Sequence, residues 1–211
     1  MYNGNKRTKK RGGFYMNKKH FALLLSFVVL LAAVCSPAYG KTLQPAFTKT
    51  YARCLEVQKT NETLKAYKNG EISLTEQQIA GIKEKYLGYL EDAFAEINKP
   101  ENAFYINYLI KTSGLLPENI SQSVKNIVAV AKMDISTDEK LELLADSSTC
   151  SDLVDVAVSC LVLGLYFLFS VAVFGVIGLA PNIVLISVAL ANINFIIALV
   201  AVVLYPIFCL F

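Results

Sequence analysis

Between residues 41 and 151 the apolar positions recur every three or four residues, which is the period of amphipathic α-helices. The pattern predicts five helices, at about residues 45–68, 75–98, 101–112, 117–131 and 136–145. The connections between them are short, as expected for antiparallel neighbours in a bundle, and no strand-like alternation occurs. We therefore expect an all-α fold in which residues 41–151 form a small helical bundle.

Two of these helices carry a strong start signal. Thr75 is followed three residues later by Gln78, and Ser136 is followed by Glu139. In such a capping box the first side chain accepts from the backbone of the second residue, whose side chain bonds back to the first. We expect the second and fifth helices to begin at these pairs.

The C-terminal third has a different pattern. After Asp155 the 56 residues to the C-terminus contain no Lys, Arg, Asp, Glu or His. A helix rises 1.5 Å per residue and a bilayer core is about 30 Å thick, so residues 153–180 and 183–205 are each long enough to cross it. We predict a transmembrane helical hairpin in residues 152–211, with a turn at Pro181-Asn182 in which Asn182 caps the second helix. A shallow, re-entrant hairpin is the alternative.

Small and polar residues follow helical spacing within this hairpin, which predicts close packing of its two helices. We expect the stripes of the two helices to face each other, and Asn194 to bond Ser170 or Tyr166 near mid-membrane. The candidate helix-packing or oligomer contacts are Gly164, Gly175, Gly178, Ser187, Ala191, Asn192, Asn194 and Ala198.

Asn192 does not lie on the stripe of small and polar residues that contains Asn194. Two helical positions correspond to a rotation of about 200°, so Asn192 and Asn194 point to nearly opposite sides and one partner helix cannot serve both. One interpretation is that Asn192 bonds to its own backbone or reaches water or lipid headgroups. The other is that it contacts a second copy of the chain, giving a homo-oligomer, or a partner membrane helix.

The N-terminal 40 residues have the pattern of a secretory signal. A basic region precedes an apolar segment at residues 21–34, and Ala38-Tyr39-Gly40 is a small-x-small cleavage motif. Met16 is an alternative start, which would make residues 1–15 a basic extension. A lipoprotein signal at Cys35 and an uncleaved anchor are the alternatives to cleavage. We expect residues 41–151 on the exported side of a membrane.

Export would permit disulfides. Cys54 and Cys150 flank the predicted bundle, so they are the candidate pair for a bridge, and two free thiols are the alternative.

Charge and residue types limit the chemistry. From Lys41 onward there are thirteen basic and seventeen acidic residues, so nucleic acid is not an expected partner. The only histidine, His20, lies in the signal, and no catalytic, cofactor-binding or metal-binding constellation is found.

The lipid bilayer is therefore the expected partner. The sequence indicates an exported, membrane-anchored helical protein with a non-enzymatic interaction or structural role, such as that of a small subunit of a membrane assembly. The alternatives are a membrane-active protein of pore-forming or toxin-like type with an insertable hairpin, and an enzyme using Ser, Lys or carboxylates alone.

Overall fold

The computed structural model describes the backbone of residues 40–176 and 181–211, and the side-chain surroundings of residues 49–171 and 183–211. The described backbone is helical and contains no strand. Its elements are α2 (Gly40–Lys68), α3 (Glu76–Asn98), the 3-10 turn η1 (Pro100–Asn102), α4 (Ala103–Ser113), α5 (Glu118–Ala131), α6 (Thr137–Ser147), α7 (Cys150–Val176) and α8 (Pro181–Cys209).

Both predicted capping boxes are confirmed. At the start of α3 the Thr75 hydroxyl accepts from the Gln78 backbone N–H at 3.2 Å, and the Gln78 side chain accepts from the Thr75 N–H at 2.8 Å. Ser136 and Glu139 make the same reciprocal pair at the start of α6. These local interactions fix where two helices begin without help from the rest of the fold.

Several predicted boundaries differ from the structure. Pro100 opens a 3-10 turn before α4. A proline is tolerated in a first turn because the N–H groups there have no acceptor within the helix. The expected turn at Pro181-Asn182 is wrong, since α8 already begins at Pro181 and Asn182 lies inside its first turn. α8 also continues through Pro206 to Cys209. The predicted signal, residues 1–39 together with its cleavage motif, lies outside the described residues apart from Gly40.

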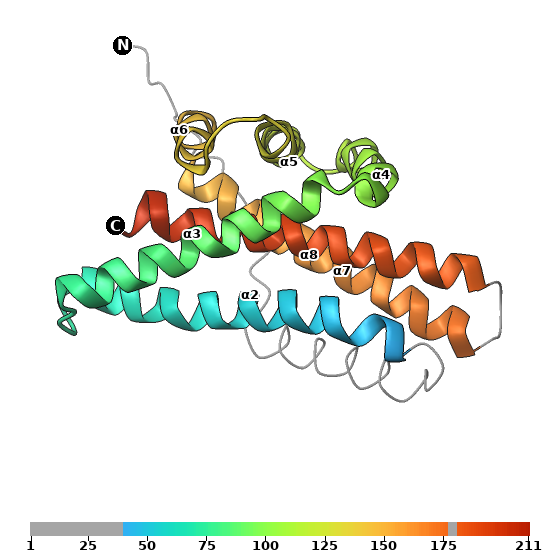
Figure 1. Ribbon diagram of the computed structural model, residues 1–211, viewed down its shortest axis with the longest axis horizontal. Helices are drawn as coiled ribbons and strands as arrows, with labels where there is room; N and C mark the ends of the chain where they lie inside the picture. The colour runs from blue at the N-terminus through green and yellow to red at the C-terminus, as the bar shows by residue number, and fades with distance from the viewer. Residues whose placement is uncertain (1–39, 177–180) are drawn as a thin grey trace, which may run out of the picture.

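Helices α7 and α8 form an antiparallel hairpin (Figure 1). A disulfide joins Cys150 to Cys209, and Gly164 lies against the ring of Phe195. These two contacts are 14 residues apart on each helix, so the pair runs without a change of register. Both helices are long and apolar enough to cross a membrane by length and composition.

The hairpin is not separate from the helices that precede it. α8 packs against α2, α3 and α4 as well as α7, and α2 and α3 run alongside it in Figure 1. In the most apolar stretch of α8, 67% of residues are buried, against 39% for α7. A single buried cluster joins side chains of α2 to α6 with those of α7 and α8. The expected division at residue 151 therefore does not coincide with a division of the core.

A proline determines how α8 meets α2. Pro206 has no N–H, so the carbonyl of Val202, four residues earlier, loses its helical donor. The side-chain amide of Asn61 in α2 donates to this carbonyl at 3.3 Å. Tyr86 of α3 donates to the other end of the same amide at 2.9 Å. Burial raises the pKa of Tyr86 to about 12, which keeps its hydroxyl a donor. One buried amide thus joins α2, α3 and α8.

A second polar contact follows two helical turns further along α2. Lys68 donates to the carbonyl of Cys209 at 2.6 Å, where the last carbonyls of α8 have no helical partner and the helix dipole favours a cation. Lys65 lies over the ring of Tyr205, and Lys83 of α3 lies over that of Phe211. α2 and α3 thus supply a hydrogen-bond donor for the last carbonyls of α8 and cations for the aromatic rings near the C-terminus.

We expect Asn61→Leu to lower the free energy of unfolding by about 1–3 kcal/mol, because it leaves the Val202 carbonyl without a donor and removes the shorter of the two hydrogen bonds of the Tyr86 hydroxyl. In a Pro206→Ala background the loss should be smaller by about 1 kcal/mol, since residue 206 then supplies an N–H to Val202. Denaturant unfolding in mild detergent measures both losses. Gln58→Leu, at an exposed position of α2, is the control. Equal losses in the two backgrounds would contradict this pairing.

Candidate functional site

The closed end of the hairpin is an apolar projection. We define the tip as residues 166–176 of α7 and 181–191 of α8, and it extends beyond α2, α3 and α4 in Figure 1. Large apolar side chains are exposed on it: Tyr166, Phe169, Ile183, Leu185 and Ile186. The exposed fraction reaches 63% at Tyr166 and 51% at Leu185. Apolar side chains grouped in this way mark a contact surface rather than scattered surface residues.

The rest of α8 has different surroundings. Every residue from Ile193 to Ala201 is buried, so protein covers α8 on all sides over this length. The sequence prediction assigned this whole helix to a membrane span, which its length and composition allow, but it did not foresee that the preceding helices cover this segment. The covering helices are amphipathic, and α8 supplies the apolar partner that their buried stripes require.

The two predicted intramembrane asparagines lie where these two environments meet. Asn194 donates to the backbone carbonyl of Leu190 at 2.8 Å, and Ser170 donates to that of Tyr166 at 3.0 Å, so the expected bond between the two helices is wrong. A side chain in a helix reaches the carbonyl four residues earlier without any partner helix. The Oδ1 atoms of Asn192 and Asn194 are buried and have no hydrogen-bond partner in the described part of the chain.

Four of the predicted helix-packing residues of α8 lie inside the protein. Ser187, Ala191, Asn194 and Ala198 are all buried. Ala191 clusters with Leu165 and Leu168 of α7.

Gly164 faces a large ring instead of another small residue. A Cβ atom at Gly164 would lie 2.9 Å from Phe195, whose side chain is fully buried. The side-chain surroundings of Gly175, and Gly178 altogether, lie outside what the structure describes.

The predicted disulfide partner is wrong. Cys150 pairs with Cys209 instead of Cys54, because the antiparallel hairpin brings its two open ends together with a Cα–Cα distance of 6.1 Å. Cys54 is a free thiol in the core, and burial raises its pKa to about 12. The hairpin register could have suggested this pairing, since both cysteines lie nearly equally far from the turn.

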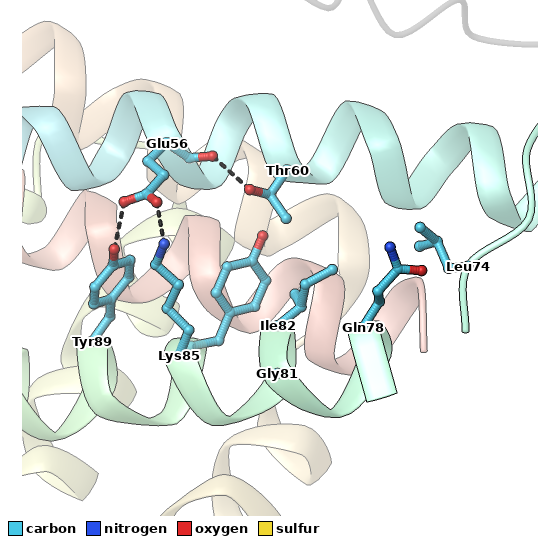
Figure 2. Close-up of a pocket in the computed structure, with 9 residues that line it drawn as sticks. Glu56, Thr60, Leu74, Gln78, Gly81, Ile82, Lys85 and Tyr89 are labelled. Carbon is cyan, nitrogen blue, oxygen red and sulfur yellow. Dashed lines mark hydrogen bonds and ion pairs between the residues drawn. The ribbon is translucent and has the colours of Figure 1, made fainter. Parts of the chain in front are cut away.

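A groove of about 350 Å³ lies between α2 and α3. Figure 2 shows Glu56 of α2 accepting from Lys85 and from the hydroxyl of Tyr89, both on α3. Tyr89 donates at 2.5 Å. The other side chains that line the groove, Thr60, Leu74, Gln78, Ile82 and Tyr86, are mixed polar and apolar.

The protonation states in this groove are those of a structural ion pair. Hydrogen bonds from Lys85 and Tyr89 lower the pKa of Glu56, and the bond to Glu56 raises the pKa of Lys85. Desolvation and the same carboxylate raise the pKa of Tyr89. At neutral pH the carboxylate is charged and both donors keep their protons, so the groove offers neither an amine nucleophile nor a phenolate base. The described residues also contain no cluster of three or more metal-ligating side chains of His, Cys, Asp or Glu.

We expect Gly164→Ala to be less stable than Gly88→Ala by at least about 1 kcal/mol. A methyl group at Gly164 would overlap the immobile Phe195 ring, whereas nothing lies within 4 Å of the corresponding atom at Gly88. Both changes remove a helical glycine, so the gain in helix propensity cancels in the comparison. Denaturant unfolding measures the difference, and equal stabilities would contradict the packing described for the hairpin.

Comparisons of the chain with protein-family models, with curated proteins and with solved structures find no match.

Proposed function

We propose that the chain is an exported, membrane-associated helical protein without enzymatic activity, whose α7–α8 hairpin attaches it to a lipid bilayer. The observation that carries this proposal is the tip, where exposed apolar side chains from two helices project beyond the bundle in a region that contains no charge. The two helices are compatible with membrane association by their length and composition.

The energetics of the tip support lipid as its environment. Each square ångström of apolar surface left in water costs about 25 cal/mol, and five large side chains contribute such surface at one end of the molecule. Amphipathic helices cover the other half of α8, whereas the described helices leave these side chains open. A bilayer removes this surface from water without a specific partner protein.

Export is supported by two features of the chain. Residues 16–40 have the three-part pattern of a secretory signal. The Cys150–Cys209 disulfide suits an oxidising compartment, such as the periplasm or the extracellular space. The bundle would then sit at the exported surface, where it works by binding other molecules, as a surface protein or as a small subunit of a membrane assembly.

A second candidate function is membrane activity by insertion of the entire hairpin. It is favoured by the burial of a membrane-length apolar helix under α2 and α3, which carry charged outer residues. In this case α2 and α3 would have to leave α8 before insertion. Ion conductance in planar bilayers distinguishes the two functions, because attachment alone produces none and pore formation requires it.

For the attachment function, we expect Leu185→Asp to weaken binding to liposomes at least tenfold. A carboxylate in the middle of a membrane helix costs about 2.5–3.5 kcal/mol, and a tenfold change corresponds to about 1.4 kcal/mol. The chain is recovered from an exporting host, and mass analysis establishes its N-terminus. Liposome flotation then gives the fraction of the chain that is bound.

Leu143→Asp is the matched control for this experiment. Leu143 is 43% exposed on α6, which lies at the end of the molecule opposite the tip in Figure 1. It should float like the unmodified chain. The attachment site is refuted if Leu185→Asp floats equally well, or if the unmodified chain does not float.

A further inference from the structure

We propose that the tip enters one leaflet of the bilayer from the side of the bundle and does not cross to the other side. This inference rests on the proposed membrane attachment and adds its depth and orientation. Three observations carry it: the length of the tip, the residues at its base, and the protein that surrounds α8 beyond that base.

The length of the tip matches half a bilayer. From Pro181 to Ala191, α8 advances ten residues, or about 15 Å, and α7 covers the same distance from Tyr166 to Val176. A hydrocarbon core of about 30 Å has leaflets about 15 Å deep. The tip is therefore long enough to fill one leaflet and too short to reach the opposite surface. Tyr51 of α2 packs against the cluster of Leu165, Leu168, Ala191 and Phe195 at its base, so on α8 the surface open to lipid ends there. On α7 a narrower exposed stripe continues through Val162, Val158 and Val154.

Polar and aromatic residues lie together at the base of the tip. Gly164 contacts Phe195, so Tyr166, two residues nearer the turn, is level with Ile193, between Asn192 and Asn194. Amphipathic rings such as that of tyrosine are favoured at the level of the lipid headgroups. This level is where the proposal places the membrane surface.

The two asparagines also argue against deeper insertion. If the hairpin crossed the bilayer, Asn192 and Asn194, about 15–20 Å from the turn, would lie near its centre. Their Oδ1 atoms have no hydrogen-bond partner in the described part of the chain. An unpaired amide oxygen costs several kcal/mol in hydrocarbon and much less near headgroups and water. Protein encloses both atoms, and one-leaflet insertion keeps this part of the protein level with the headgroups instead of at the centre of the hydrocarbon, where the surroundings are least polar.

Beyond the base, protein prevents lipid from reaching α8. Residues from Ile193 to Ala201 are buried, and Asn61 and Lys68 of α2 bond the backbone of α8 further along. Crossing the bilayer would require breaking these contacts and exposing the buried stripes of α2 and α3. Insertion of the tip alone leaves them intact.

Thiol labelling from the two sides of sealed vesicles tests this depth. Ile183→Cys, in the first turn of α8, should be protected from a charged maleimide supplied outside, on the side of the bundle, or trapped inside. It should become reactive when detergent dissolves the bilayer, because Ile183 is 43% exposed in the structure. Leu143→Cys, also 43% exposed, should react only with the outside reagent. Peptide mass analysis separates these sites from the native cysteines.

Each alternative gives a different result. Labelling of Ile183→Cys from inside means that the hairpin crosses the bilayer, which overturns one-leaflet insertion and leaves membrane attachment standing. Labelling from outside means that the tip is in water, which overturns the attachment as well. Protection that persists in detergent means that protein covers the tip, for example a second copy of the chain, and also overturns the inference.

Discussion

The C-terminal half of α8 is held by α2, and the arrangement of the whole molecule depends on this contact. Pro206 frees the carbonyl of Val202, and Asn61 binds it from the buried face of α2. Tyr86 of α3 binds the same asparagine. A helix that is almost entirely apolar gives few directional contacts, so this freed carbonyl and the end of the helix at Cys209 are the points where its position can be specified.

This contact divides one apolar hairpin between two environments. On one side of the level of Asn192 and Asn194, α8 is the central helix of a bundle whose outer surface is charged. On the other side both helices expose large apolar side chains, whereas on the bundle side only α7 does so, at Val154, Val158 and Val162. The disulfide between Cys150 and Cys209 joins the two helices at the bundle end, and the Phe195 ring packs on Gly164 nearer the tip. The hairpin is thus fixed in the bundle and open at its tip.

Local signals in the sequence predicted much of the helical structure. The capping boxes at Thr75 and Ser136 depend on residues three positions apart, and the amphipathic stripes depend on helical spacing, so both can be recognised without knowing the fold. The pairing of Cys150 with Cys209 and the contact between Asn61 and Val202 link residues 59 and 141 positions apart. The cysteine pairing follows from the register of the hairpin, and no local pattern encodes the contact between Asn61 and Val202.

The packing of bundle and hairpin around one shared core was not predicted, for a related reason. An uncharged helix is compatible with lipid and with a protein core, and composition does not distinguish the two. The deciding information lies in the buried stripes of α2 and α3, which need an apolar partner, and in Pro206, whose missing N–H requires a donor from elsewhere. The exposed apolar tip is the part of the hairpin where both helices are open to the predicted lipid environment.

The reactivity of the native Cys54 thiol in the membrane-bound chain tests the central claim most directly. Cys54 lies on the buried face of α2, and its burial raises its pKa to about 12. If α2 stays on α8 in the bilayer, a water-soluble maleimide should react with Cys54 only after denaturation. Reaction at the rate of an unfolded cysteine in the folded, membrane-bound chain would show that α2 has left α8, and would contradict the account.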